Sequence, residues 1–249
     1  MTVSAVGIVV ALQAEARTLA RAPVAPGTVV ELADGSRLWL AGMGQAAAGQ
    51  GARALVEAGV QALASFGVAG ALDVSLRSGV LLCPPHVVDE HGHGYASDPA
   101  WCERLCLRLS RARLAVRYDQ ALLSLSATLG DRRAKQAAGQ RYGCAAVDLE
   151  SAAVAAVARE CGLPFMALRA IVDERDDRVP AALEAAVDRW GQPRPGALLL
   201  VLLRRPWLLI SLPRLARRMA KALAALRRAA CVAPCLGAGV VEGQRPMVS

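Results

Sequence analysis

The sequence predicts an α/β sandwich, because short apolar runs typical of buried strands alternate with Ala-rich or amphipathic segments typical of helices. Hydrophobic residues make up 55% of the 249 residues and charged residues 20%, a composition that excludes a disordered or fibrous chain. Aromatic residues make up only 4%, which disfavours proteins that bind RNA or single strands by base stacking. The length fits one large domain or two small ones.

The first part of the chain predicts strand-then-helix units with a short antiparallel hairpin between them. Asp34-Gly35 between two alternating segments favours a hairpin turn, and Gly59 is suited to end a helix. The glycine-spaced stretch Gly67–Gly70 is interpreted as a turn that lets the backbone approach a ligand closely. The expected strands span residues 6–12, 28–32, 37–41 and 62–68, and the expected helices span 13–19 and 45–58.

The second part repeats this alternation. Residues 91–101 are rich in Gly, His, Ser, Asp and Pro, which indicates a loop, and we expect His91 and His93 to form part of a pocket wall. In such folds ligands bind at the carboxyl ends of the strands. The expected strands span residues 79–88, 121–126, 145–150 and 165–172, and the expected helices span 101–111, 132–140 and 151–161.

The positive charge of the chain is concentrated near its end. Residues 1–188 carry 18 basic and 20 acidic residues, whereas residues 189–241 carry ten basic residues and no acidic one. This distribution favours an anionic surface as the partner of the last segment and disfavours a nucleic-acid footprint over the whole domain. We therefore expect a body at 1–190, an apolar and basic helical segment at 191–230, and a disordered tail at 231–249.

Two interpretations of the basic segment stay open. The apolar run 196–212 is interrupted by Arg204-Arg205-Pro206, so neither half is long enough to span a bilayer. Basic residues then recur at helical spacing over 213–228, as in a helix that lies in a membrane interface. The alternative is a terminal helix that packs on the core and keeps its arginines in solvent.

Cysteine and histidine usage predicts reduced thiols and no metal. The seven cysteines are an odd number and lack the spacing of a disulfide framework. The N-terminus lacks the charged region that precedes the apolar run of an export signal. We therefore expect a cytoplasmic protein. Cysteines and histidines between Cys83 and Cys102 match no common zinc pattern, and we expect no metal site. Cys231 and Cys235 fall in the expected tail and receive no role, with lipid attachment left open.

Three acidic positions are candidates for chemistry. Glu150 follows an apolar strand and precedes a helix, where it could accept hydrogen bonds from a diol or simply cap the helix. Asp173 ends another apolar run, and burial at a sheet edge would raise its pKa and suit it to donate a proton. The alternative is an ordinary loop residue in the charged cluster that follows. Glu15 lies on the first strand-to-helix connection.

Four segments together resemble the purine nucleoside phosphorylase and nucleosidase superfamily, in particular its methylthioadenosine/S-adenosylhomocysteine nucleosidase branch. The resemblance covers residues 5–190 and implies a three-layer α/β/α fold with a mixed central sheet that binds adenosine-like substrates. The segments are GIVVALQAE at 7–15, GMG at 42–44, FGVAG at 66–70, and VDLES at 147–151 with LRAIVD at 168–173.

The resemblance assigns a role to each carboxylate. Asp173 matches the acid that protonates the departing purine at N7, Glu15 matches the base that activates water, and Glu150 matches the residue that binds the ribose hydroxyls. Such groups stabilise the charges that develop when an N-glycosidic bond breaks. Four further residues are expected to contact substrate: Leu149, Gly67, Val68 and Gly44.

Departures from the family pattern bear on the nucleophile. Val68 stands where a serine or threonine is common, and Ser65-Phe66 precede Gly67 where phosphorolytic relatives place an arginine. The anion pocket therefore looks poor, which favours water, although Arg53 or Arg169 could supply the missing charge and phosphate could still be a co-substrate. Val172 replaces the serine that commonly precedes the acid. No cofactor is implied.

With its basic apolar segment, the chain resembles the hopanoid-associated phosphorylases, whose implied role is to remove adenine from adenosylhopane during hopanoid biosynthesis. This resemblance implies a lipid-linked adenine nucleoside as substrate, peripheral contact with the inner face of the cytoplasmic membrane, no nucleic-acid partner, and a homo-oligomer. One alternative is a soluble methylthioadenosine/S-adenosylhomocysteine nucleosidase or purine nucleoside phosphorylase. The other is a non-catalytic membrane or nucleic-acid binding module.

Overall fold

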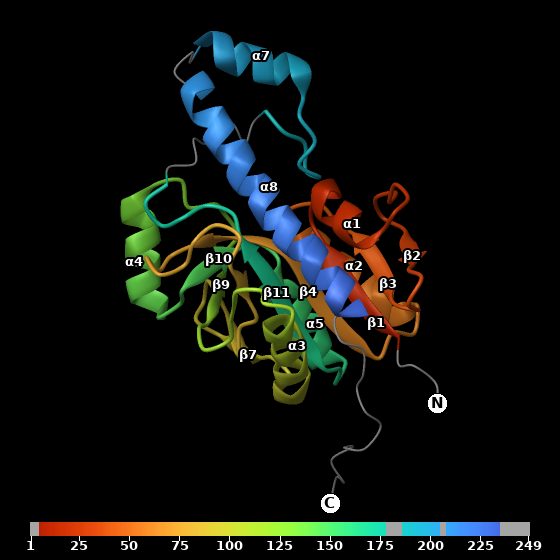
Figure 1. Ribbon diagram of the computed structural model, residues 1–249. Helices are drawn as coiled ribbons and strands as arrows, with labels where there is room; N and C mark the ends of the chain where they lie inside the picture. Colours follow the sequence, from red (N-terminus) through yellow and green to blue (C-terminus); the bar gives the residue numbers. More distant parts are fainter. Residues whose placement is uncertain (1–4, 178–185, 205–207, 235–249) are drawn as a thin grey trace, which may run out of the picture.

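A mixed β-sheet with helices on both faces forms the body of the protein in the computed structural model, which describes residues 5–177, 186–204 and 208–234 (Figure 1). The strands are β1 (Val6–Val10), β2 (Val29–Glu31), β3 (Arg37–Leu40), β4 (Ala62–Ala71), β5 (Leu81–Leu82), β6 (His86–Asp89), β7 (Gly94–Ala96), β8 (Val116–Arg117), β9 (Leu122–Ser124), β10 (Ala146–Asp148) and β11 (Phe165–Ile171). The helices are α1 (Gln13–Leu19), α2 (Gln45–Glu57), α3 (Pro99–Arg111), α4 (Arg132–Tyr142), α5 (Ser151–Glu160), α7 (Pro195–Arg204) and α8 (Leu208–Val232).

The strand order explains where a site can form. The main path runs β2-β3-β1-β4-β10-β9-β6-β7, and β11 branches from β4 to join β5 and β8. Strands β1, β4 and β11 run parallel, so their carboxyl ends meet at one edge. Strand β10 pairs antiparallel with the end of β4, through Val147 opposite Gly70. The segments that carry the candidate carboxylates are therefore neighbours in space.

Two aliphatic cores lie on opposite faces of the sheet. One contains the buried side chains of α1, α3 and α8, and the other contains those of α2 and α5. Small residues such as Ala48, Ala52 and Ala155 are fully or almost fully buried, which lets α2 and α5 pack closely together. The predicted three-layer α/β/α fold with a mixed sheet is confirmed.

The stretch Gly67–Gly70 was expected to be a turn, and this prediction was wrong. These residues continue β4, where Gly67 pairs with Arg169 and Gly70 pairs with Val147. Because glycine has no side chain, each of the two glycines leaves space beside β4 for a neighbouring carboxylate. A Cβ atom at Gly67 would lie 2.4 Å from Glu15 Oε1, and one at Gly70 would lie 3.0 Å from Asp173 Oδ2.

The end of α8 packs on the body. Ala222, Leu226 and Ala229 are fully buried in the core that α1 and α3 share, whereas Arg227 and Arg228 are exposed. This part of the basic segment is thus a terminal helix with a solvated arginine face. In Figure 1, α7 and the first part of α8 stand away from the sheet. None of the described helices is both long and apolar enough to cross a bilayer.

The predicted boundary at residue 231 also needs correction. Cys231 lies inside α8, while the expected disordered tail falls outside the described residues from position 235 onward. Within the described chain the six cysteines form no disulfide. Arg205 and Pro206, which interrupt the apolar run, fall in the undescribed gap between α7 and α8.

Candidate active site

A cavity of about 170 Å³ lies at the carboxyl ends of β1, β4, β10 and β11. Its wall combines three carboxylates predicted from the sequence, Glu15, Glu150 and Asp173, with apolar side chains and one lysine. The full lining is Ala11, Leu12, Glu15, Met43, Val68, Ala69, Gly70, Thr128, Leu129, Lys135, Val147, Asp148, Leu149, Glu150, Val172 and Asp173. A concave, mostly apolar site with convergent polar groups is typical of small-molecule binding.

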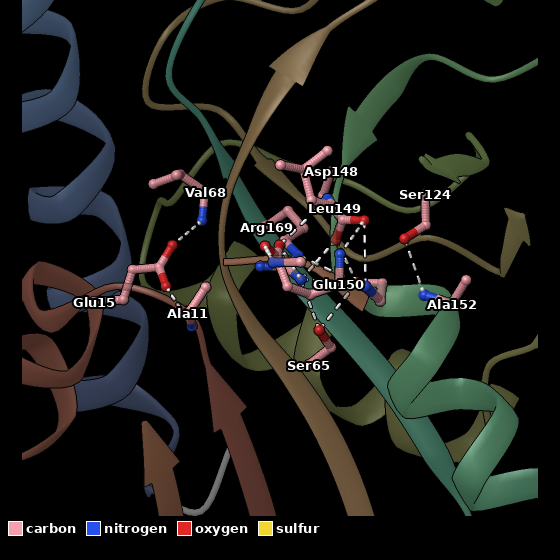
Figure 2. Close-up of polar contacts among 12 residues, drawn as sticks. Ala11, Glu15, Ser65, Val68, Ser124, Asp148, Leu149, Glu150, Ala152 and Arg169 are labelled. Carbon is pink, nitrogen blue, oxygen red and sulfur yellow. Dashed lines mark hydrogen bonds and ion pairs between the residues drawn. The ribbon is translucent and has the colours of Figure 1, made fainter. Parts of the chain in front are cut away.

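Glu15 is held by backbone donors from two directions. It is the third residue of α1, so its Oε2 reaches back to accept from Ala11 N (3.0 Å) and Leu12 N (2.9 Å). Its Oε1 accepts from Val68 N on β4 at 2.8 Å (Figure 2). Burial raises the pKa of Glu15, while the Arg169 guanidinium and these backbone bonds oppose the rise. The result is a fixed buried carboxyl at the cavity wall.

Glu150 faces Gly44, a residue 106 positions earlier in the chain. Gly44 N donates to Glu150 Oε1 at 3.0 Å, and Leu149 N donates to Oε2 at 3.3 Å. The Glu150 side chain makes no cap hydrogen bond to α5, so the capping interpretation was wrong. Burial, followed by the negative charge of Asp148, raises the pKa of Glu150 to about 7, against the lowering effect of Arg169.

A buried network beneath the cavity fixes the end of β10. Arg169 lies on β11, where its guanidinium forms an ion pair with Asp148 and donates to Ser65 Oγ (2.7 Å) and Ser151 Oγ (2.9 Å). Asp148 accepts from the Ser151 hydroxyl and from the backbone N–H groups of Glu150 and Ser151 at the start of α5. Figure 2 shows Arg169 between these groups. Asp148 therefore holds the backbone at the start of α5, and Glu150 lines the cavity with its Oε2 at 3.9 Å from Arg169 Nη2.

Asp173 meets a lysine that was not anticipated. Lys135 on α4 is 1% exposed, and its Nζ donates to Asp173 Oδ2, to Glu174 O (3.2 Å) and to Asp177 O (3.3 Å). Asp173 is thus a buried, ion-paired carboxylate and not an ordinary loop residue. Burial was the only influence on Asp173 expected from the sequence, whereas the structure places a buried ammonium in contact with its carboxylate.

The comparison with protein families matches residues 5–204 to the model described as the phosphorylase superfamily. The chain belongs to this superfamily. Among curated proteins, none matches the chain in sequence. The superfamily membership agrees with the resemblance that the four sequence segments indicated.

Several solved structures share the fold at low sequence identity. The 5'-methylthioadenosine/S-adenosyl homocysteine nucleosidase of Campylobacter jejuni is 18% identical with a TM-score of 0.62, covering 71% of this chain and 89% of that one. The futalosine hydrolase of Helicobacter pylori is 17% identical with a TM-score of 0.62, over 81% and 98%. The nucleosidase of H. pylori bound to butyl-thio-DADMe-Immucillin-A is 15% identical with a TM-score of 0.64, over 93% and 99%.

Several other predicted site residues can now be placed in this superfamily fold. Val68 and Leu149 line the cavity. Gly67 and Gly44 are not part of the lining but contact residues that are: Gly67 leaves room for Glu15, and Gly44 N donates to Glu150. We placed His91 and His93 in the pocket wall, which was wrong, because both occupy the exposed turn between β6 and β7 and donate their backbone N–H groups to Asp89.

Neither arginine considered for an anion pocket is available there. Arg53 lies on α2, 57% exposed, and pairs with Glu160, while Arg169 is committed to Asp148. Lys135 is the one basic side chain of the described lining, and it already donates to three oxygens. Over the described residues there is also no group of three or more His, Cys, Asp or Glu side chains suited to a metal ion.

The signal for Lys135 was present in the sequence. Lys135 is one of only two lysines among the 29 basic residues, and on a helix it shares a face with Ala138 and Tyr142, which pack on an apolar cluster. A cation on the apolar face of a helix needs a buried partner.

Proposed function

We propose that this protein cleaves the N-glycosidic bond of an adenine nucleoside, with Asp173 as general acid, Glu15 as the base that activates water, and Glu150 as the ligand of the ribose hydroxyls. The observation that carries the proposal is the meeting of these three carboxylates around one cavity, although they are far apart in the chain. The nucleosidase and futalosine hydrolase structures that share the fold support this class of reaction.

The positions of the three groups suit the charges of the reaction. When the bond from C1′ to the purine breaks, its electron pair moves to the base while positive charge grows on the ribose. A proton from Asp173 to purine N7 neutralises the first charge, and Glu150 stabilises the second. Glu15 Oε1, which accepts only one backbone N–H, keeps a lone pair for the proton of an attacking water.

Water is the nucleophile that the cavity favours. Phosphate carries about two negative charges near neutral pH and needs donors with free N–H groups. Here the lining offers Lys135, whose three protons are already engaged, beside four acidic residues. We expect adenine release at equal rates with and without phosphate, and a strict phosphate requirement would replace this proposal with phosphorolysis.

The substrate we propose is a lipid-linked adenine nucleoside, adenosylhopane, presented by an anionic membrane. Support comes from the chain that leads into α7, because Trp190 O accepts from Gln13 N (3.0 Å) and Arg189 O accepts from Met43 N (2.7 Å). Leu12 and Met43, beside these contacts, line the cavity. The apolar helix α7 thus begins near the cavity rim. Exposed arginines, among them Arg204 and Arg217, would face lipid headgroups.

The decisive experiment measures adenine release from adenosylhopane in detergent and from methylthioadenosine, each with and without phosphate. Glu15→Gln and Asp173→Asn should each lower the rate by on the order of 100-fold or more. Glu160→Gln, which removes an exposed carboxylate on α5, is the matched control and should change nothing. Activity on methylthioadenosine alone would keep the reaction and refute the lipid-linked substrate. No adenine from any riboside would refute the reaction.

Flotation with vesicles tests the membrane contact separately. Full-length protein should float with phosphatidylglycerol vesicles at low salt and remain behind with phosphatidylcholine vesicles. The pair Arg204→Gln and Arg217→Gln should weaken flotation, whereas Arg53→Gln and Arg111→Gln, an equal loss of exposed charge from α2 and α3, should not. Absence of flotation with either lipid would refute peripheral association.

A further inference from the structure

We infer that Lys135 is a positioning residue for the proposed proton donor: it orients the Asp173 carboxyl and stabilises the carboxylate that is left when the proton moves to the purine. The inference rests on the proposed function, since it assigns Lys135 a part in the step that Asp173 performs. The observation behind it is the ion pair between Lys135 Nζ and Asp173 Oδ2 at the cavity wall.

All three hydrogen bonds of the Lys135 ammonium go to the segment that carries Asp173. Its ammonium is buried and has three acceptors, namely the Asp173 carboxylate and the carbonyls of Glu174 and Asp177. Each of its N–H groups therefore points into the segment that follows β11. A buried ammonium is costly without such partners, so the side chain is held in one position. It ties α4 to the loop that carries Asp173.

This contact orients the two oxygens of Asp173 differently. Oδ2 accepts from Lys135, and no hydrogen bond to Oδ1 is found within the described residues. On the opposite side Gly70 allows the carboxylate to sit against β4, where a Cβ would lie 3.0 Å from Oδ2 and 3.1 Å from Oδ1. Oδ1 is thus the oxygen left to carry the proton toward a bound base.

The charge of Lys135 makes the proton transfer more favourable. In the step, the Oδ1–H bond of Asp173 breaks, an N7–H bond forms, and the electron pair of the broken glycosidic bond stays on the purine. Asp173 ends as a carboxylate in contact with an ammonium, which stabilises it. Lys135 therefore raises the rate of the proton transfer.

Other charged groups near Asp173 are either paired or on the far wall of the cavity. From its own loop, Glu174 and Asp177 pair with Arg218 on α8, Glu174 also pairs with Arg77, and Asp177 also pairs with Arg214. Glu15, Asp148 and Glu150 line the same cavity from α1 and the end of β10. Among the charged groups of the described lining, Lys135 is the cation in direct contact with Asp173.

The test is the kinetics of adenine release by Lys135→Met and Lys135→Gln, of which Gln keeps a donor for Asp173 without the charge. Both should lower kcat by about 10-fold or more and leave KM nearly unchanged, because the lost charge acts on the proton transfer and not on substrate binding. Lys135→Arg, which keeps the charge, should retain most of the wild-type kcat. Thermal unfolding of each variant identifies which ones are folded.

The outcomes separate this inference from the proposed function. If wild type releases adenine and Asp173→Asn does not, yet folded Lys135→Gln keeps the wild-type kcat, the inference about Lys135 is wrong and the function stands. If folded Lys135→Arg loses as much kcat as Lys135→Met, or if KM rises together with the fall in kcat, Lys135 only supports the fold. If wild type releases no adenine from any nucleoside, the proposed function fails first.

Discussion

Arg169 and Asp148 form an ion pair, with 2.6 Å between Nη2 and Oδ2 although each side chain is only 1% exposed. The pair joins β11 to the end of β10, next to each of the segments that carry Glu150 and Asp173. Because Asp148 also accepts from the N–H groups of Glu150 and of Ser151, the first residue of α5, the ion pair connects the start of that helix to β11. It is therefore a structural link beneath the cavity.

Arg169→Met should strongly destabilise the protein. The substitution leaves the Asp148 carboxylate buried without its partner, and breaking a buried pair in this way costs about 3–5 kcal/mol. The free energy of unfolding in urea measures this loss. Arg53→Met, which removes an exposed ion pair with Glu160, is the control and should change it by less than about 1 kcal/mol. Equal effects of the two variants would contradict a structural role for Arg169.

Glu150 should make substrate binding depend on pH near neutrality. Its pKa is about 7 because of burial and the nearby Asp148 charge, and a carboxylate accepts hydrogen bonds from a diol better than a neutral carboxyl. KM should therefore fall as pH rises from 6 to 8. Glu150→Gln should raise KM and remove this dependence. A wild-type pH profile of KM in the Gln variant would separate Glu150 from ribose binding.

The same raised pKa has a consequence for stability. Because the folded-state pKa lies above the ordinary value of 4.5, the folded state binds the proton more tightly than the unfolded state. The stabilising contribution of the protonated Glu150 to the folded state is present below about pH 4.5 and is lost as pH rises through about 7. Urea unfolding of Glu150→Gln and of wild type measures this effect. The free energy of unfolding of the variant, minus that of wild type, should be larger at pH 8 than at pH 5.

The sequence was informative where periodicity and turn chemistry agree. Helix α1 spans the predicted residues 13–19, and the Asp34-Gly35 hairpin joins β2 to β3 as predicted. The sequence misled at Gly67–Gly70, because the local tendency of glycine to form turns is overridden by pairing of this part of β4 with β11 and, at Gly70, with β10. Strand β10 spans only Ala146–Asp148, shorter than the predicted 145–150.

The candidate site was predicted in part for a physical reason. Carboxylates that end apolar strands are visible in the sequence, so Glu150 and Asp173 could be proposed. The partner of Glu150 is Gly44, 106 residues away, and the partner of Asp173 is Lys135, 38 residues away. No local sequence pattern predicts such a long-range contact. Likewise, that Asp148 and not Glu150 caps α5 depends on Arg169, which only the folded sheet brings near.

Gly67 and Gly70 should be required for the positions of two carboxylates. A Cβ at Gly67 would approach both Glu15 Oε1 and Arg169 Nη1, at 2.4 and 2.5 Å, so Gly67→Ala should lower stability and activity together. The clash at Gly70 is milder, because the added Cβ would lie 3.0 Å from Asp173 Oδ2. Gly70→Ala should therefore fold and lower kcat by about 10-fold or more.

Gly94→Ala is the matched control for these glycines. Gly94 also lies in a strand, β7, and its added Cβ would meet nothing within 4 Å. Its melting temperature and kcat should equal those of wild type. If Gly70→Ala were as active as Gly94→Ala, the position of Asp173 against β4 would not matter to the reaction.

The packing of α8 can be tested at Leu226, which is fully buried against the core shared with α1 and α3. Leu226→Ala should lower the free energy of unfolding by about 2–5 kcal/mol, because it removes buried methyl groups and leaves a cavity. Arg227→Ala, at the adjacent exposed position, should lower it by less than about 0.5 kcal/mol. Unfolding is measured without lipid, so an unchanged stability in Leu226→Ala would mean that α8 is not part of the folded core. A loss of the expected size would show that the end of α8 is part of the folded body, in contrast to α7, which stands away from the sheet in Figure 1.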